Sequence, residues 1–144
     1  MKSLSLLLLF LFFASSTFAQ CYEYQTEIQN IENKLEGFSK ILKESEKAST
    51  FLDCQKIIDK AIVQAKAATE SATMAKSIAQ DCSCNEGAKL AETIYTIAFD
   101  AYSLVKKAVD AGNLESAREL TKKAVIAAEN AKSEASYGSS ACND

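Results

Sequence analysis

The most constraining feature of this chain is a stripe of small residues between Cys54 and Cys82. Nine residues recur there at alternating spacings of four and three, which is the spacing of one face of an α-helix. They are Cys54, Ile58, Ala61, Ala65, Ala68, Ala72, Ala75, Ala79 and Cys82. A helix face this flat lets a neighbouring helix approach closely but buries little area itself. We therefore expect larger side chains from elsewhere to fill the core.

The segment from Tyr22 to Lys47 supplies larger apolar side chains. They also alternate at spacings of four and three, at Tyr24, Ile28, Ile31, Leu35, Phe38 and Leu42. This heptad pattern predicts a helix over about residues 22–47. Gly37 lies inside it, which indicates a close approach of a neighbour, a bend, or a tolerated glycine.

Capping residues divide the rest of the chain into three further helices. The predicted helices are 51–80, 86–111 and 114–137. Thr50 offers an N-cap oxygen, and Asp53 can reach back as a capping-box acid. Asn85 is the predicted cap of the next helix. Gly112 stands where a helix C-terminus favours a left-handed residue, and Asn113 caps the last helix.

Helix 86–111 is the most apolar of the three. Its three adjoining stripes are Ala91, Ile94, Ala98, Ala101, Val105 and Ala108; Leu90, Ile97 and Leu104; and Tyr95, Tyr102 and Val109. Apolar residues over so much of a helix predict that it is central or that it carries a binding surface. The predicted contact residues are Tyr95, Ile97, Tyr102, Leu104 and Val109, because aromatic and large apolar side chains are favoured anchors.

Four helices joined by short links predict an all-α, antiparallel up-down four-helix bundle made of two helical hairpins. This topology brings Cys21, Cys82, Cys84 and Cys142 to the same end of the bundle, where we expect disulfides in an exported protein. We favour Cys21 with Cys82 and Cys84 with Cys142, so that each bond closes one hairpin. The rival pairing joins Cys21 to Cys84 and Cys82 to Cys142. A Cys82–Cys84 bond is disfavoured by strain.

The fifth cysteine, Cys54, lies near the opposite end and has no partner. We interpret it as a small buried residue of the helix stripe, with an intermolecular disulfide or a reactive thiol as the alternative. Zinc binding by the cysteines is disfavoured because they lack paired CxxC spacing.

The N-terminus has the features of an export signal. Lys2 precedes ten mostly apolar residues, 4–13, and Thr17 and Ala19 are small residues at cleavage positions. We predict cleavage after Ala19, which gives a signal peptide over 1–19, a single helical-bundle domain over 20–144, and a secreted or periplasmic location. A lipoprotein anchored at Cys21 is the alternative. The apolar run is too short to span a bilayer and no later segment is long enough, so we predict no transmembrane segment.

Composition argues against most enzymes. The chain has no histidine, tryptophan or proline, and histidine is the commonest general base and zinc ligand. We predict no catalytic residues, no metal and no cofactor. Without Lys2, 15 basic side chains face 19 acidic ones, a net charge of −4. The two signs are interspersed, so we expect no binding to nucleic acid or to anionic lipid.

Residues 108–124, AVDAGNLESARELTKKA, resemble the turn of a tetratricopeptide helix pair, with small residues and Asn113 at the link. The flanking helices are longer than that repeat's period of about 34 residues allows. No function follows from the resemblance.

The favoured function is a non-enzymatic, exported interaction protein that binds a protein partner through a helix face, of which an inhibitor or immunity protein is one version. A homo-oligomer is also compatible with this pattern. One alternative is a carrier for a small apolar ligand, with Phe38, Tyr95, Phe99 and Tyr102 lining the site. The other is a coiled-coil-like spacer of the cell envelope.

Overall fold

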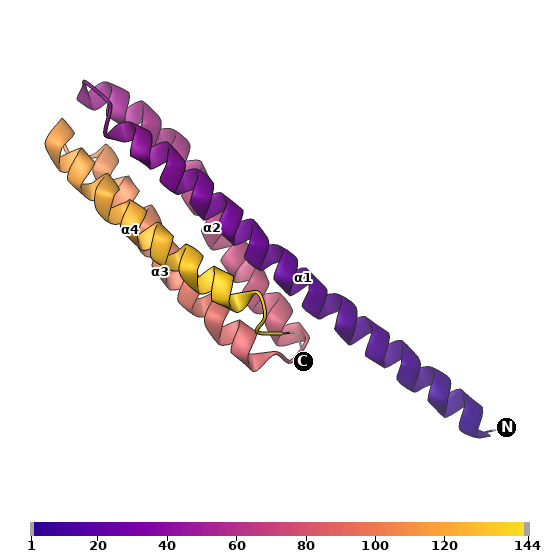
Figure 1. The fold of residues 1–144 in the computed structure, drawn as a ribbon. Helices are drawn as coiled ribbons and strands as arrows, with labels where there is room; N and C mark the ends of the chain where they lie inside the picture. The colour runs from indigo at the N-terminus through magenta and orange to yellow at the C-terminus, as the bar shows by residue number, and fades with distance from the viewer. Residues whose placement is uncertain (1, 143–144) are drawn as a thin grey trace.

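The computed structural model describes the backbone of residues 2–142 and the side chains of residues 21–142. This part of the chain forms the helices α1 (Lys2–Ser45), α2 (Phe51–Asp81), α3 (Asn85–Val109) and α4 (Leu114–Gly138). Each helix packs beside the next, and α4 returns to α1, so the helices run up and down around one core (Figure 1). The predicted disulfide-linked, all-α four-helix bundle is confirmed.

Helix α1 begins much earlier than residue 22, where the heptad pattern places its start. It is continuous from Lys2, and its N-terminal part projects beyond the ends of the other three helices (Figure 1). The predicted signal peptide falls in this projecting part, whose side chains lie outside the described residues, so it stays a prediction. Within the residues that the structure describes, no helix has the length and apolarity needed to cross a membrane.

The core has large side chains mainly from one helix and small ones from the other three. The largest fully buried side chains of α1 are Tyr24, Phe38, Ile28, Ile31, Leu35 and Leu42. The buried residues of α2, α3 and α4 are mostly alanines, joined by a few larger side chains such as Ile58, Ile94 and Val105. This confirms that the alanine stripe receives its bulk from elsewhere. The flat faces also let α2 and α4 touch across the bundle.

The helix caps agree with the sequence except before α3. The Asp53 N–H donates to Thr50 Oγ1 over 3.1 Å, and the Ser116 N–H donates to Asn113 Oδ1 over 2.9 Å. Gly112 has the predicted positive φ, at 75°. The prediction that Asn85 caps α3 is wrong, because the cap is Cys84, whose sulfur accepts from a backbone N–H.

Gly37 is a tolerated glycine. A Cβ added there would meet only the Gln64 side chain, at 3.9 Å, which is ordinary van der Waals contact. No close approach therefore requires a glycine at this position.

Candidate functional site

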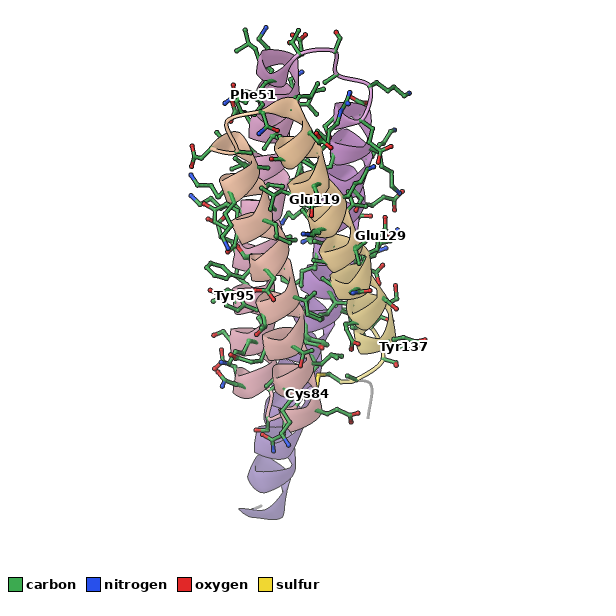
Figure 2. The ribbon with its side chains drawn as sticks, turned by 90° about the vertical axis from the view of Figure 1, so that its left-hand side faces the viewer. Phe51, Cys84, Tyr95, Glu119, Glu129 and Tyr137 are labelled. Carbon is green, nitrogen blue, oxygen red and sulfur yellow. A yellow bond between two sulfur atoms is a disulfide. The ribbon has the colours of Figure 1, made fainter. Side chains whose placement is uncertain are left out.

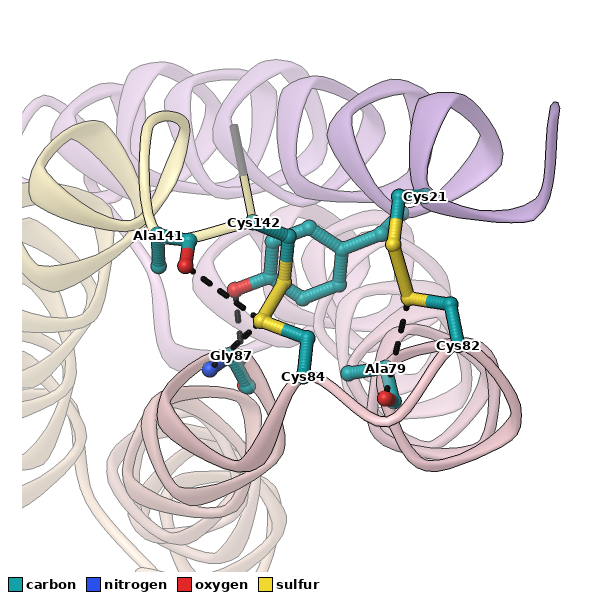
Figure 3. Close-up of a disulfide and its surroundings, with 8 residues drawn as sticks. Cys21, Ala79, Cys82, Cys84, Gly87, Ala141 and Cys142 are labelled. Atoms are coloured by element: carbon teal, nitrogen blue, oxygen red, sulfur yellow. Dashed lines mark hydrogen bonds between the residues drawn. A yellow bond between two sulfur atoms is a disulfide. The ribbon is translucent and has the colours of Figure 1, made fainter. Parts of the chain in front are cut away.

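Both disulfides lie at the same end of the bundle (Figure 3). Cys21 of α1 is joined to Cys82 after α2, with their Cα atoms 5.9 Å apart. Cys84 before α3 is joined to Cys142 after α4, with a Cα separation of 5.8 Å. This is the pairing in which each bond closes one helical hairpin. It ties every helix to a neighbour at this end.

The turn after α2 separates the two bonded cysteines Cys82 and Cys84. Ser83 has a φ of 61°, and its N–H donates to Gln80 O while the Cys84 N–H donates to Ala79 O. These two bonds form a Schellman motif, the common way to end a helix with a left-handed residue. The motif ends α2 sharply. Cys82 can therefore bond to Cys21 of α1 while Cys84, two residues later, bonds to Cys142 after α4.

Tyr24 fills the core beneath the disulfides. Its side chain is fully buried, and its hydroxyl donates to Gly87 O over 3.4 Å. A Cβ on Gly87 would collide with Cys142 Sγ and come within 3.1 Å of Tyr24 Cζ. The Gly87 N–H also donates to Cys84 Sγ, which caps α3 (Figure 3). The tyrosine, the glycine and the Cys84–Cys142 bond therefore form one packed unit with a structural role.

Burial, with a smaller contribution from the negative charge of Glu86, raises the pKa of Tyr24 from 10.0 to about 12. Below the ordinary pKa both folded and unfolded chains keep the phenol proton. Between the two pKa values only the unfolded chain ionises, so alkaline pH favours unfolding.

We expect the free energy of unfolding to fall by up to about 2–3 kcal/mol more in the wild type than in Tyr24→Phe as the pH rises from about 9 to about 12. Denaturant unfolding of both proteins at these two pH values measures the difference. Equal losses in the two proteins would show that Tyr24 ionises as readily in the folded chain as in the unfolded chain.

Cys54 is a free, fully buried thiol at the opposite end. Burial raises the pKa of its thiol, and the nearby Arg118 charge and a hydrogen bond with Ser45 only partly offset this. A buried, protonated thiol is a poor nucleophile. The position therefore agrees with a small core residue. Among the described residues, no group of three or more metal-binding side chains is placed to hold an ion.

The five residues predicted as an interaction surface lie on two sides of α3. Tyr95, Tyr102 and Val109 repeat every seven residues on the side of α3 toward α2, where Glu92, one turn before Tyr95, pairs with Lys76 of α2. Ile97 and Leu104 repeat on the stripe of Leu90 toward α4. Leu90 lies where a Cβ on Gly138 of α4 would be. All five are partly buried against the core. The five residues therefore lie on two sides of α3 and do not form one continuous surface.

The exposed apolar feature of α3 is a row of three rings. Tyr95 and Phe99 stack with centroids 5.9 Å apart and planes 15° apart, and Phe99 meets Tyr102 at 6.1 Å. Phe99 is 45% exposed. Tyr95 points outward from the side of the bundle (Figure 2). We call Tyr95, Phe99 and Tyr102 the aromatic row.

The sequence-based surface omitted Phe99 because its stripe is otherwise polar. A lone phenylalanine in the middle of a charged stripe is the signal that could have found it.

The four residues predicted to line a ligand site are not brought together. Phe38 is fully buried on α1, whereas the aromatic row is on the outside of α3, the helix diagonally opposite. A groove of about 290 Å³ does lie between α1 and α4. Its lining residues are Leu42, Lys43, Glu46, Thr121, Lys122, Val125 and Ile126. None of the four residues predicted to line a ligand site lines this groove.

No known protein family, curated protein or solved structure matches this chain.

Proposed function

We propose that this protein is a non-enzymatic, exported binding protein that contacts a protein partner through the aromatic row of α3. The observation that carries the proposal is the row of neighbouring rings Tyr95, Phe99 and Tyr102, with Phe99 stacked on Tyr95 and 45% exposed. Aromatic side chains are enriched among the residues that dominate binding energy, because each buries a large area at a small entropy cost.

The rigidity of the bundle favours this role. The three rings come from successive turns of one helix, and the two disulfides link all four helices at one end. A surface that does not have to be ordered on binding loses less entropy when the partner arrives. The row is therefore suited to contact without rearrangement.

The proposal of export rests on two independent features. The disulfides are compatible with an oxidising compartment outside the cytoplasm. The N-terminal residues have the charge, the apolar run and the small residues of a signal peptide. Edman sequencing or intact-mass measurement of the protein from culture medium or periplasm tests this. A chain beginning at Gln20 supports export, and a full-length chain confined to the cytoplasm contradicts it.

A non-enzymatic role is supported by the chemistry of the described residues. The groups whose pKa values burial raises are Tyr24 and Cys54, and both are packed in the core. Neither is placed to act on a substrate.

A capture experiment with matched surface variants tests the aromatic row. Phe99→Lys puts a charge where the row is exposed, and Ile126→Lys makes the same kind of change on α4, where the side chain is 62% exposed. We expect crosslinked capture from the native extracellular fraction to be lost in Phe99→Lys and kept in Ile126→Lys, because a charge in the row opposes its burial by a partner. Quantitative mass spectrometry of the crosslinked products measures this. Equal capture by both variants and the wild type would contradict the proposal.

A further inference from the structure

We infer that the aromatic row binds a second copy of this chain, with the two α3 helices antiparallel. The inference rests on the proposed function, since it names the partner of the same surface. It starts from the outermost stripe of α3 together with the C-cap residue Asp110, seven residues in all that alternate at spacings of three and four. They are Lys89, Glu92, Thr96, Phe99, Ser103, Lys106 and Asp110. All are exposed except Ser103, which is half-buried.

The charges on this stripe are self-complementary about Phe99. A two-fold axis at Phe99 in an antiparallel pair brings each residue opposite one equally far on the other side. Glu92 then faces Lys106 of the second copy, seven residues to either side. Lys89, ten residues before Phe99, lies within one residue of the level of Asp110 of the second copy, which is eleven residues after Phe99. Two copies give four attractive pairs, and Phe99 packs on Phe99 at the centre.

The parallel alternative lacks this match. Two parallel copies in register would place Lys89 on Lys89 and Glu92 on Glu92, which is repulsive at every charged position. Charges of this kind contribute little affinity but determine which orientation forms. The stripe therefore specifies the antiparallel pair.

The groups needed for these contacts are accessible. Phe99 is 45% exposed. Glu92 forms an ion pair with Lys76 of α2, yet its side chain stays 53% exposed, so a second lysine can approach it. On one flank of the stripe, Tyr95 of one copy lies toward Tyr102 of the other, which extends the apolar centre.

The opposite flank contains one unfavourable contact. Asp100 lies beside Phe99, and the two-fold axis brings the Asp100 side chains of the two copies near each other. Asp100 is exposed, so water and salt weaken their repulsion. We expect Asp100→Asn to tighten the pair.

The pair should be weak and in exchange with monomers. A helix of 25 residues is about 37 Å long. The surface area buried between two helices of that length is at or below the about 1,200–2,000 Å² buried in stable complexes. Association is therefore expected over micromolar to submillimolar protein concentrations, and an assay at a single low concentration would miss it.

Sedimentation equilibrium tests the inference. The samples are the oxidised protein, in the form that an expressing cell exports, and variants in which the charge of one residue is reversed. Glu92→Lys alone and Lys106→Glu alone each place like charges at two symmetric positions, so each should weaken dimerisation by about tenfold. An equimolar mixture of the two variants restores both pairs and should associate as a heterodimer. Thermal unfolding followed by circular dichroism checks that each variant stays folded.

Four outcomes overturn the inference. A dimer unaffected by Phe99→Lys forms through another surface. If the mixture of the two charge variants stays monomeric, the antiparallel register is wrong. A wild type that is monomeric throughout, while Phe99→Lys still loses a captured protein, assigns the row to a different protein and leaves the proposed function standing. If the wild type is monomeric and Phe99→Lys also captures normally, the proposed function fails too.

Discussion

Replacing Phe38 with alanine is expected to lower the free energy of unfolding by about 3–5 kcal/mol. Phe38 is fully buried on α1 and is among the largest side chains in the core. The facing helices present mostly alanines, such as Ala65 and Ala68, whose side chains are too short to move into the space. The cavity therefore stays open, and its cost adds to the lost burial of the ring.

Phe99→Ala is the matched control, because the same side chain is removed from the surface of α3. With 45% of that residue exposed, we expect a loss of about 1 kcal/mol or less. Chemical denaturation at fixed pH measures both variants. If Phe38→Ala costs no more than Phe99→Ala, then α1 does not supply the bulk of the core.

Removing the Cys84–Cys142 bond by a double change to alanine is expected to cost about 4 kcal/mol, from the entropy of a 58-residue separation in the unfolded chain. The Cys21–Cys82 bond spans 61 residues, so loop closure alone predicts the same cost for its removal. Any excess for Cys84–Cys142 reports its packing against Tyr24 and Gly87 together with the loss of the Cys84 cap of α3.

Guanidinium unfolding of the oxidised protein and of both double variants gives these differences. Chemical reduction of the wild type removes both bonds together and should produce the largest loss. A reduced protein as stable as the oxidised one would show that the disulfides do not hold the helix ends.

Most of the fold could be predicted from the sequence because its determinants are local. Alternating spacings of three and four define each buried face. Thr50 and Asn113 mark helix starts through bonds to residues three positions away, and Gly112 marks a helix end through its positive φ. Short links then require antiparallel neighbours. Once helix directions alternate, Cys21, Cys82, Cys84 and Cys142 fall at one end, but the choice between the favoured pairing and its rival depends on contacts between helices.

What could not be predicted depends on contacts between helices. Cys84 replaces Asn85 as the cap of α3 because its disulfide holds the sulfur near the Gly87 N–H. The stripes of Tyr95 and Ile97 flank the same buried face, and the sequence does not say which neighbour each one meets. In the structure these two stripes lie on different sides of α3 and are partly buried, whereas Phe99 is 45% exposed.

The unequal division of core volume has a consequence for how this sequence can change over time. An alanine of α2, α3 or α4 can grow only if a residue of α1 shrinks at the same level, because little other space is available. Relatives of this chain should therefore show compensating pairs of substitutions between the first helix and the other three, rather than independent drift at each site.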